Sequence, residues 1–415
     1  MKIAIAGYGL EGEQNYLYYS ALGYDVTIVD EKELPDRPIP EGAKTLLGKG
    51  VFSSLEGYDQ VIRTAGLSPK KIKTDGTIWS ATNEFFEKSP APIIGVTGTK
   101  GKGTTSSFIY EILKAARKDV YLVGNIGVSA LKVLPKLTAK SIVVYELSSF
   151  QLWDIQKSPH IAVILGIEPD HLDVHSNLED YISAKANIVH HQSESDIVVY
   201  KSTNETSVQI SKLSPGIHFP YPNDMSDFKK SIMVPGAHNI ENASAAIIAT
   251  HEYVTDEATI KKGLKSYEGL PHRIKFVREV NGVSYYDDSY SSAPSAAIAA
   301  VKSFNNQKIL FLGGYDKGAD FSVLASVLAQ TDSLKKIVLY GQTSQRIYSA
   351  LKEARVLDDK IVIVESTNFS KIIGEAIQVA EPGDIVILSP ACASFDMFKN
   401  FSERGDQFID IIEAL

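Results

Sequence analysis

Short apolar runs alternate with amphipathic stretches along most of the 415 residues. Each run has the length of a buried strand. The stretches that follow carry apolar residues three to four positions apart, as helices packed on a sheet do. Glycine, proline and asparagine separate the two kinds of segment. This alternation predicts an α/β protein with parallel sheets.

The pattern predicts the individual strands and helices. Strands are expected at Lys2–Ala6, Asp25–Val29, Gln60–Thr64, Ile93–Val96, Val120–Val123, Ile142–Glu146, Ile161–Gly166, Ile197–Tyr200, Val283–Tyr286, Ile309–Leu312, Ile337–Tyr340, Ile361–Val364 and Ile385–Leu388. Helices are expected from Gly12 to Leu22 and at Ser106–Ala116, Leu178–His190, Asn239–Thr250, Pro294–Phe304, Phe321–Ala329, Gln345–Leu351 and Lys371–Ala380. The polar stretch Ser202–Met233 gives only a weak pattern.

The composition is that of a folded protein in a reducing compartment. Apolar residues make up 44% of the chain and charged residues 22%, which excludes disorder as the main state. The single cysteine, Cys392, excludes an intrachain disulfide. No apolar run is long enough to cross a bilayer, and glycine follows the N-terminus too early for a secretory signal. We therefore expect a cytoplasmic protein without membrane insertion.

The formal net charge is −8, from 42 basic and 50 acidic residues. A mildly acidic chain is a poor general ligand for nucleic acid, so no nucleic-acid partner is expected. An anionic substrate would need local positive sites.

Two glycine-rich loops separate a strand from a helix. Gly7, Gly9 and Gly12 follow the first strand, and Asp30 ends the second, which is typical of a nucleotide site; a tight turn is the alternative. The second loop comprises Gly98, Thr99, Lys100, Gly101, Lys102, Gly103 and Thr104. Its amides and Lys102 would hold phosphates. Because the residue directly after Lys102 is a glycine, which has no hydroxyl, Thr104 would supply the hydroxyl that reaches Mg²⁺. A surface turn is the alternative.

Further polar residues follow later strands of the middle segment. Glu146 ends one strand, and Asp170-His171-Leu172-Asp173 follows another, so both suit a divalent cation. Lys185 has small neighbours on a helix and could point into a site. The alternatives are an exposed strand-end carboxylate, a polar turn and a solvated lysine.

Other candidates lie on one helix and on four loops. Asn239 and Asn242 share a helix face and could bind adenine or phosphate, or could cap the helix. The loops at residues 271–273, 287–289, 313–320 and 389–394 fall at or near strand ends, where open α/β sheets bind ligands. Cys392 is expected to be a packing residue rather than a nucleophile.

Taken together, these motifs resemble those of the Mur ligases of peptidoglycan synthesis. The motifs are Gly-Thr-x-Gly-Lys at 98–102, Glu-Leu-Ser-Ser-Phe-Gln at 146–151, Asp-His-x-Asp at 170–173, His-Asn-x-x-Asn at 238–242, Leu-Pro-His-Arg at 270–273 and Ser-Pro-Ala-Cys-Ala-Ser at 389–394. The tail Phe398-Lys399-Asn400-Phe401-x-x-Arg404-Gly405 looks like that of the D-glutamate-adding members. The resemblance covers nearly the whole chain.

The resemblance implies three domains. Residues 1–89 would form a Rossmann-like domain for the UDP substrate, residues 90–268 a P-loop-type ATPase domain, and residues 269–415 a Rossmann-like, dinucleotide-fold domain for the amino acid. The UDP substrate would contact Gly7, Gly9, Gly12, Asp30, Thr64, Gly66, Asn125, Ser148 and Gln151. ATP would contact residues 98–104, Asn239, Asn242, Arg273 and Asp288, with His272 nearby.

The implied reaction joins D-glutamate to UDP-N-acetylmuramoyl-L-alanine through an acyl phosphate, with ATP and two Mg²⁺ ions. Lys102, His171 and Lys185 would be catalytic. Thr104, Glu146, His171 and a carbamate on Lys185 would hold the metals. Ser292, Lys317, Ser394 and Phe401 would bind the amino acid. A monomer is expected.

One departure from the family pattern concerns the amino acid. The family's Asn-Asp-Ser-Lys-Ala-Thr-Asn reads Asp287-Asp288-Ser289-Tyr290-Ser291-Ser292-Ala293, so a tyrosine replaces the expected lysine. L-glutamate or another acidic amino acid is therefore an alternative substrate. A folylpolyglutamate-synthase-like ligase is a second alternative, which the N-terminal segment disfavours. A non-catalytic nucleotide-binding scaffold is a third, which the intact Lys102, Glu146, His171 and Lys185 disfavour.

Overall fold

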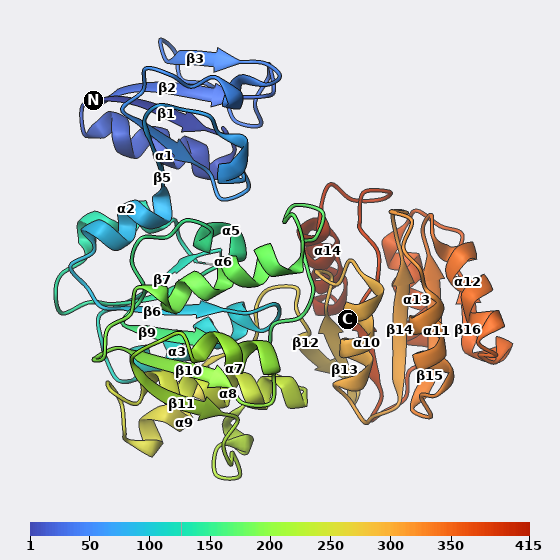
Figure 1. Cartoon of the computed structure of the whole chain (residues 1–415). Coiled ribbons are helices and arrows are strands. Elements are labelled where there is room, and N and C mark those ends of the chain that lie inside the picture. The colour runs from blue at the N-terminus through green and yellow to red at the C-terminus, as the bar shows by residue number, and fades with distance from the viewer. Residues whose placement is uncertain (126) are drawn as a thin grey trace. The chain divides into compact units, whose positions relative to one another are not determined.

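The computed structural model describes residues 1–125 and 127–415. The chain forms two units, each with its own internal contacts: residues 1–231 with 240–266, and residues 232–239 with 267–415. The first unit contains two sheets and the second unit one (Figure 1). The α/β class with mainly parallel strands is therefore confirmed.

The first sheet has the order β3-β2-β1-β4-β5, and all its strands are parallel. Its strands are β1 (Lys2–Ala6), β2 (Asp25–Asp30), β3 (Lys44–Leu47), β4 (Gln60–Arg63) and β5 (Thr77–Ser80). Helix α1 (Leu10–Ala21) packs Tyr19 against Ile3 and Ile5 on one face. The loops that contain Phe52 and Leu67 cover the other face.

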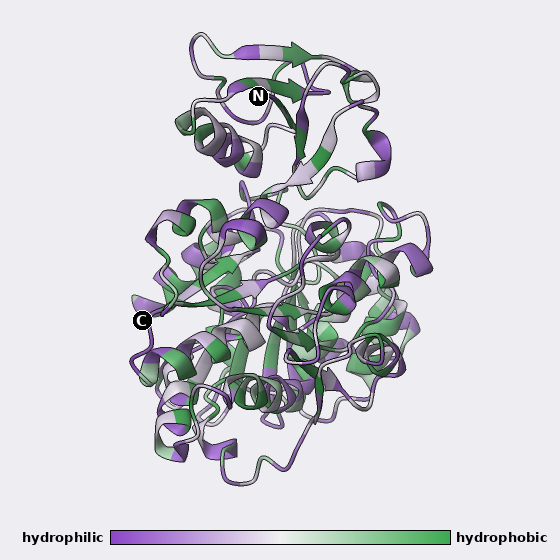
Figure 2. Ribbon diagram, turned by 60° about the vertical axis from the view of Figure 1, so that its left-hand side comes forward, coloured by the Kyte–Doolittle hydropathy of each residue, from purple (hydrophilic) through white to green (hydrophobic). Residues whose placement is uncertain are grey.

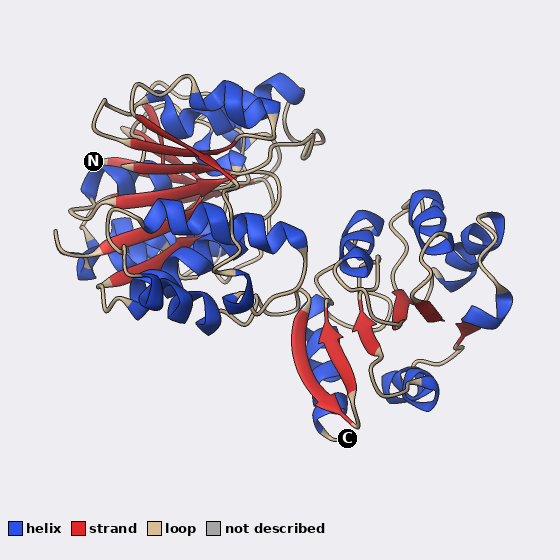
Figure 3. Ribbon diagram, turned by 90° about the horizontal axis from the view of Figure 1, so that it is seen from below, coloured by secondary structure: helices blue, strands red, loops and turns tan. Residues whose placement is uncertain are grey.

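The second sheet is also fully parallel, with the order β11-β10-β9-β6-β8-β7. Its strands are β6 (Ile93–Thr97), β7 (Val120–Gly124), β8 (Ile142–Glu146), β9 (Ile161–Ile164), β10 (Ile197–Lys201) and β11 (Ile217–Tyr221). Helices lie on both faces of this sheet (Figure 3). The central strands β6, β8 and β9 are buried at every position. Across the structure, hydrophobic residues gather on the inner strands and hydrophilic residues on loops and on parts of the helices (Figure 2).

Apart from α1, the helices of the first unit precede, separate or follow the strands of the second sheet along the chain. They are α2 (Ala81–Lys88), α3 (Lys102–Ala115), α4 (Ala130–Val133), α5 (Ser149–Leu152), α6 (Leu178–His190), α7 (Glu205–Ser211) and α9 (Glu257–Ser266), with α8 (Ala237–Thr250) crossing the boundary between the units. Helix α2 follows the first sheet but buries Phe85 and Phe86 in the core of the second. The predicted domain boundaries at residues 90 and 269 stay a prediction.

The third sheet has the order β12-β13-β17-β14-β15-β16. Its strands are β12 (Lys275–Val280), β13 (Val283–Asp287), β14 (Lys308–Gly313), β15 (Leu334–Tyr340), β16 (Ile361–Ile363) and β17 (Ile385–Leu388). Helices α10 (Pro294–Lys302), α11 (Ser322–Ala329) and α12 (Ser344–Glu353) cover one face, and α13 (Phe369–Val379) and α14 (Phe401–Glu413) cover the other. Strand β12 is antiparallel to β13 and forms an edge.

The predicted strands all exist, with small shifts at their ends. The pattern missed β3, β5, β11, β12, α2, α4, α5, α7, α9 and α14. The helix predicted to start at Ser106 already begins at Lys102, because the glycine before it takes a left-handed conformation and the helix starts directly from the loop.

Candidate active site

The loop between β6 and α3 requires glycine at two positions. Gly98 has φ of 152° and Gly101 has φ of 86°. A Cβ atom on Gly101 would lie 2.5 Å from Oδ1 of Asn242 in α8, and one on Gly98 would lie 2.6 Å from Cβ of Leu165. The loop is therefore closely packed from two sides, and the predicted ATP residue Asn242 lies directly against it.

Lys102 folds back over this loop. Its Nζ donates hydrogen bonds to the carbonyl oxygens of Gly98 at 3.1 Å and Thr99 at 3.0 Å. Gly103 and Thr104 continue the first turn of α3, whose backbone N–H groups favour an anion. Lys100 is exposed to solvent. This arrangement can hold phosphate groups.

Thr99 ties the loop to the segment after β9. Its hydroxyl donates to the carbonyl of Glu168 at 2.9 Å and accepts from the amide of the same residue at 2.8 Å. The same hydroxyl lies 2.9 Å from the Tyr181 hydroxyl. Sequence reasoning missed Tyr181, although its position one helical turn before Lys185 puts the two on one face of α6.

Lys185 is buried, with 2% of the residue exposed. Its Nζ donates to the carbonyl of Gly98 at 2.9 Å and lies 4.8 Å from the Tyr181 ring centroid. In the described part of the chain, no carboxylate forms an ion pair with it. Burial, together with the positive charge of Lys102, lowers the pKa of Lys185 well below its usual range. The solvated-lysine alternative is therefore wrong.

Glu146 is buried at the end of β8, with 3% of the residue exposed. The exposed strand-end alternative is therefore wrong too. Nδ2 of Asn125 lies 3.5 Å from Oε1 of Glu146, so the predicted substrate residue and the predicted metal ligand are neighbours. Ile126, which follows Asn125 in its motif, lies outside the described residues.

His171 has φ of 53° and a half-exposed side chain. Its Nε2 lies 3.7 Å from Oδ2 of Asp170, and its ring packs against Phe150 with the centroids 5.0 Å apart. Among residues 1–125 and 127–415, no three His, Cys, Asp or Glu side chains converge in a way that could hold a metal ion. Mg²⁺ usually takes only one or two protein carboxylates and completes its shell with phosphates and water, so this donor set fits a nucleotide-bound ion.

The first sheet brings three of its predicted substrate residues together. A Cβ atom on Gly7 would lie 2.3 Å from the Thr64 hydroxyl, and one on Gly12 would lie 2.1 Å from the Gly7 carbonyl. Oδ2 of Asp30 accepts from the Tyr8 amide at 2.6 Å. The ends of β1, β2 and β4 are therefore held in contact, while Gly9 and Gly66 leave open space.

Ser148 and Gln151 bond to each other. The Ser148 hydroxyl accepts from the Gln151 amide at 3.2 Å, and the Gln151 carboxamide accepts from the Ser148 amide at 2.9 Å. This is a capping box at the start of α5. Both predicted substrate residues thus have a structural role.

In the second unit, the loop after β13 is held by internal hydrogen bonds. Asp288 is buried and accepts from the hydroxyls of Ser291 at 2.5 Å and Ser389 at 2.6 Å. Burial, only partly offset by these hydrogen bonds, raises the pKa of Asp288 to about 7. Nδ1 of His272 lies 2.6 Å from Oδ2 of Asp287, and this hydrogen bond raises the pKa of His272. The predicted ATP residue Asp288 therefore has its carboxylate already bonded.

Arg273 stacks on Tyr290, with its guanidinium carbon 3.7 Å from the ring centroid. The Tyr290 ring also meets the Phe401 ring edge-on, with a centroid distance of 5.0 Å. The tyrosine that replaces the family's lysine thus joins a predicted ATP residue to a predicted amino-acid residue.

Two of the remaining predicted residues, Lys317 and Ser394, lie in or beside the loop after β14. Nζ of Lys317 lies 5.4 Å from the ring centroid of Phe395, which follows the buried Ser394 in the chain. The Tyr315 amide donates to the Ala393 carbonyl at 2.8 Å. Ser292 is exposed. Asn239 donates through Nδ2 to the Pro235 carbonyl at 2.6 Å, as a helix-end residue does.

Arg404 lies in the tail motif, to which the resemblance assigns no role at this position. It is fully buried and donates to Ser289 Oγ at 2.9 Å, to the Ser289 carbonyl at 2.8 Å and to the Cys392 carbonyl at 3.1 Å. No carboxylate of the described residues forms an ion pair with it. Arg404 therefore joins the loop after β13 to the loop after β17. Cys392 is buried, and burial raises the pKa of its thiol to about 11, as expected for a packing residue.

Comparisons with known proteins agree with this geometry. The family model for the Mur ligase middle domain matches residues 96–219, and that for the Mur ligase glutamate ligase domain matches residues 272–392. A protein of Acetivibrio thermocellus named UDP-N-acetylmuramoylalanine--D-glutamate ligase is 37% identical over 452 residues, with 100% of this chain and 96% of the relative covered. A protein of the same name from Ruminiclostridium cellulolyticum is 36% identical, with 100% and 97% covered.

Solved structures share the fold. The UDP-N-acetylmuramate-alanine ligase of Thermotoga maritima aligns with a TM-score of 0.64 and 19% identity, covering 100% of this chain and 99% of its own. A folylpolyglutamate synthase of Mycobacterium tuberculosis aligns with a TM-score of 0.57 and 13% identity, covering 79% of this chain and 94% of its own. None of the described helices is long and apolar enough to cross a bilayer. The full-length identity and the two matched domains establish that this chain belongs to the Mur ligase family.

Proposed function

We propose that this ATP-dependent amide ligase of peptidoglycan synthesis joins D-glutamate to UDP-N-acetylmuramoyl-L-alanine. The observation that carries the proposal is the phosphate loop with Lys102 folded over it and the buried Lys185 amine beneath it. The names of relatives that match the whole chain support the choice of substrates. We expect the reaction in the cytoplasm, catalysed by a monomer.

The three-domain arrangement of the family is part of this proposal. The glycine loop after β1 and the turn after β4 would hold the UDP part, and the second sheet would hold ATP. The third sheet would present the amino acid from the loops around Lys317, Ser394 and Phe401. The close packing of Gly7 against Thr64 supports a preformed nucleotide turn.

The reaction has two steps, phosphoryl transfer and amide formation. The alanyl carboxylate oxygen forms a bond to the γ-phosphorus of ATP, and the bond from that phosphorus to the β–γ bridging oxygen breaks and releases ADP. The amine nitrogen of glutamate then bonds to the acyl carbon, the nitrogen loses a proton, and phosphate leaves. Lys102 would steady the γ-phosphate, and His171, half-exposed, would be available to accept the proton.

Thr104, Glu146, His171 and Lys185 would hold the magnesium ions. Mg²⁺ supplies charge neutralisation on the transferred phosphate. Because its pKa is lowered, the Lys185 amine is available as a nucleophile toward CO₂; N–C bond formation with loss of a proton gives a carbamate. A carbamate converts this buried cation into an oxygen ligand.

Phosphate release from ATP tests the proposal. The purified protein is incubated with ATP, Mg²⁺, UDP-N-acetylmuramoyl-L-alanine and D-glutamate, L-glutamate or D-aspartate. We expect release with D-glutamate and a product heavier by one glutamyl residue. Release only with L-glutamate would overturn the stereochemical assignment, and no release with any amino acid would overturn the ligase assignment.

A folylpolyglutamate-synthase-like activity is the second candidate, favoured by Gly103 after the lysine, as in the Gly-Lys-Gly-Ser loop of those enzymes. The solved folylpolyglutamate synthase covers only 79% of this chain, whereas the relatives above cover all of it. A reduced folate in place of the UDP substrate in the same assay distinguishes the two.

A further inference from the structure

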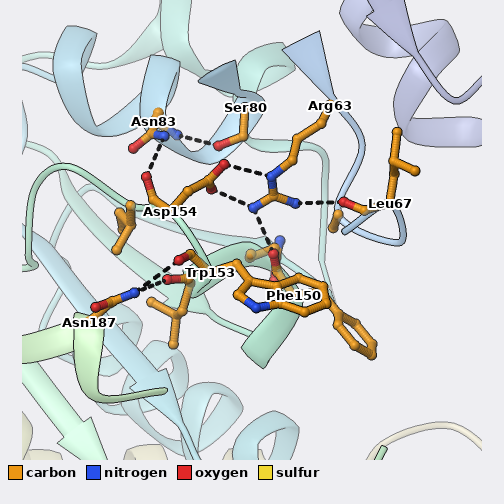
Figure 4. A network of polar contacts seen from close by, with 12 residues as sticks. Arg63, Leu67, Ser80, Asn83, Phe150, Trp153, Asp154 and Asn187 are labelled. Atoms are coloured by element: carbon orange, nitrogen blue, oxygen red, sulfur yellow. Dashed lines mark hydrogen bonds and ion pairs between the residues drawn. The ribbon is translucent and has the colours of Figure 1, made fainter. Parts of the chain in front are cut away.

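Arg63, the last residue of β4, connects the first sheet to the second. Its guanidinium is fully buried and pairs with the Asp154 carboxylate through two hydrogen bonds, from Nε at 2.7 Å and from Nη2 at 2.5 Å (Figure 4). Nη2 also donates to the Phe150 carbonyl at 2.9 Å, and Nη1 to the Leu67 carbonyl at 3.4 Å. One side chain thus bonds its own turn and a segment about 90 residues later.

That later segment comprises α5 and the residues as far as Gln156. Two asparagines hold it as well. Asn83 of α2 donates to the Asp154 carbonyl at 3.0 Å and accepts from the Gln156 amide at 2.8 Å. Asn187 of α6 donates to the Leu152 carbonyl at 2.9 Å (Figure 4). Three elements therefore hold the segment, and among the described residues Arg63 provides the side-chain contact from a strand of the first sheet.

Arg63 bonds two groups of residues, the turn after β4 and the start of α5. Both groups include residues predicted to contact the nucleotide-sugar substrate. Thr64 and Gly66 lie in the turn that Arg63 closes. Ser148 and Gln151 form the capping box of α5, and both lie within two residues of Phe150, whose carbonyl Arg63 bonds. A substrate that contacts both groups needs them at a constant separation, and displacement by about 1 Å can cost up to ~100-fold in rate.

We propose that Arg63, paired with Asp154, is a positioning residue that fixes the turn at residues 64–67 relative to α5 and thereby sets the affinity for the nucleotide-sugar substrate. This inference rests on the proposed function. A bidentate pair between a buried arginine and a part-buried carboxylate suits the role, because its planar geometry fixes both distance and orientation, which a lysine does not.

The test separates the two substrates. Arg63→Lys keeps the charge but cannot bond Asp154, Phe150 and Leu67 together. We expect its KM for UDP-N-acetylmuramoyl-L-alanine to rise about tenfold while its KM for ATP stays unchanged, because Arg63 bonds no residue of the phosphate loop. The matched control is Lys157→Met, which removes the exposed Lys157–Glu87 pair close to Asp154 and should leave both KM values unchanged.

A double variant and a hydrogen-exchange measurement provide two further tests. If Arg63→Lys fails to fold, the double variant Arg63→Met/Asp154→Leu replaces the ion pair with apolar groups and should fold, with the same selective rise in KM. Hydrogen exchange of the amides at residues 64–68 and 149–154 should be faster in Arg63→Lys than in the control, even if the wild type proves inactive with this substrate. Equal rises in both KM values, or unchanged exchange, would overturn the inference; inactivity of the wild type would overturn only the proposed function.

Discussion

Lys185 has an unusual environment for an ammonium group. An ammonium group normally needs water or a carboxylate, yet this one has neutral oxygen partners and the cation Lys102 as a neighbour. Such burial costs stability and is typical of functional lysines.

Lys185→Ala should reduce ligase activity at least ~100-fold, because catalytic positioning groups contribute on that order. A short-chain carboxylate added to the assay should restore part of the activity by standing in for the carbamate oxygens. Lys114→Ala, which changes an exposed lysine of α3, serves as control and should leave activity unchanged. Full activity of Lys185→Ala without carboxylate would remove this residue from the metal site.

Tyr290 provides a second prediction at this scale. Tyr290→Lys restores the family's lysine but would set an ammonium group beside the Arg273 guanidinium. Because an exposed cation–π contact is worth about 0.5–1 kcal/mol and the new charges repel each other, we expect kcat/KM for ATP to fall about threefold to tenfold. Tyr290→Phe keeps the stack and should behave as the wild type. Higher activity of Tyr290→Lys than of the wild type would contradict this expectation.

Motifs indicated which residue types make up the candidate site, because glycine, lysine and carboxylate at fixed spacing have few structural equivalents, and the roles of these residues stay a prediction. They did not predict burial or pairing. The sequence favoured a solvated Lys185 by default, and nothing in it marked the Arg63–Asp154 or His272–Asp287 pairs. Such pairs form between residues far apart along the chain, and only the fold brings them together.

At the scale of elements, α6 shows how local and distant interactions combine. Asn177 caps the helix by accepting from the Asp180 amide at 2.8 Å, and the Asp180 side chain accepts from Lys70 of the first sheet's connecting loop at 2.8 Å. Desolvation opposes ionisation, but Lys70 and the Ser176 amide outweigh it and lower the pKa of Asp180 to about 2.

This pKa predicts how stability depends on pH. Asp180 has an ordinary value of 3.8 when unfolded, so its ionised form stabilises the fold fully above about pH 4, and that contribution is lost as the pH falls toward 2. Asp180→Asn should therefore lower the free energy of unfolding at pH 7, with the difference from wild type shrinking between pH 4 and 2. Urea unfolding at several pH values measures it. Glu179→Gln, an exposed carboxylate on the same helix turn, should not show this pH dependence.

Helix α6 was also predicted with its observed ends, because Asn177, the acidic first turn and the periodic apolar residues all agree. Strands β3 and β12 were missed for the opposite reason. They are edge strands with exposed positions, so they lack the apolar run that marks a buried strand. Helix α5 is a single turn, too short for a periodic pattern.

At the scale of the whole molecule, the two units have separate hydrophobic cores. The clusters around Phe85 and Tyr145 belong to the first unit, and those around Leu310 and Phe311 to the second. Residues that share a hydrophobic core unfold cooperatively. Because each unit has its own core, the two units should unfold in two separate transitions.

Differential scanning calorimetry of Arg404→Met checks this. Removing the buried guanidinium takes this donor from the carbonyl oxygens of Ser289 and Cys392, at about 1–3 kcal/mol each. We expect the transition of the second unit to move down by ~5 °C or more and the other transition to stay in place. Arg346→Met, which breaks an exposed pair with Asp316 in the same unit, should shift it by less than ~2 °C. A shift of both transitions would mean that the units unfold together.

The packing of α9 against α3 has a consequence for biosynthesis. A Cβ atom on Gly263 in α9 would lie 2.5 Å from Cα of Ile112 in α3, so the helix that carries the phosphate loop is covered by a helix made about 150 residues later. The segment at residues 232–239 emerges earlier, although it belongs to the second unit. During synthesis the first unit therefore cannot complete its fold before residues 232–239 of the second unit have been made, because α9 follows them in the chain.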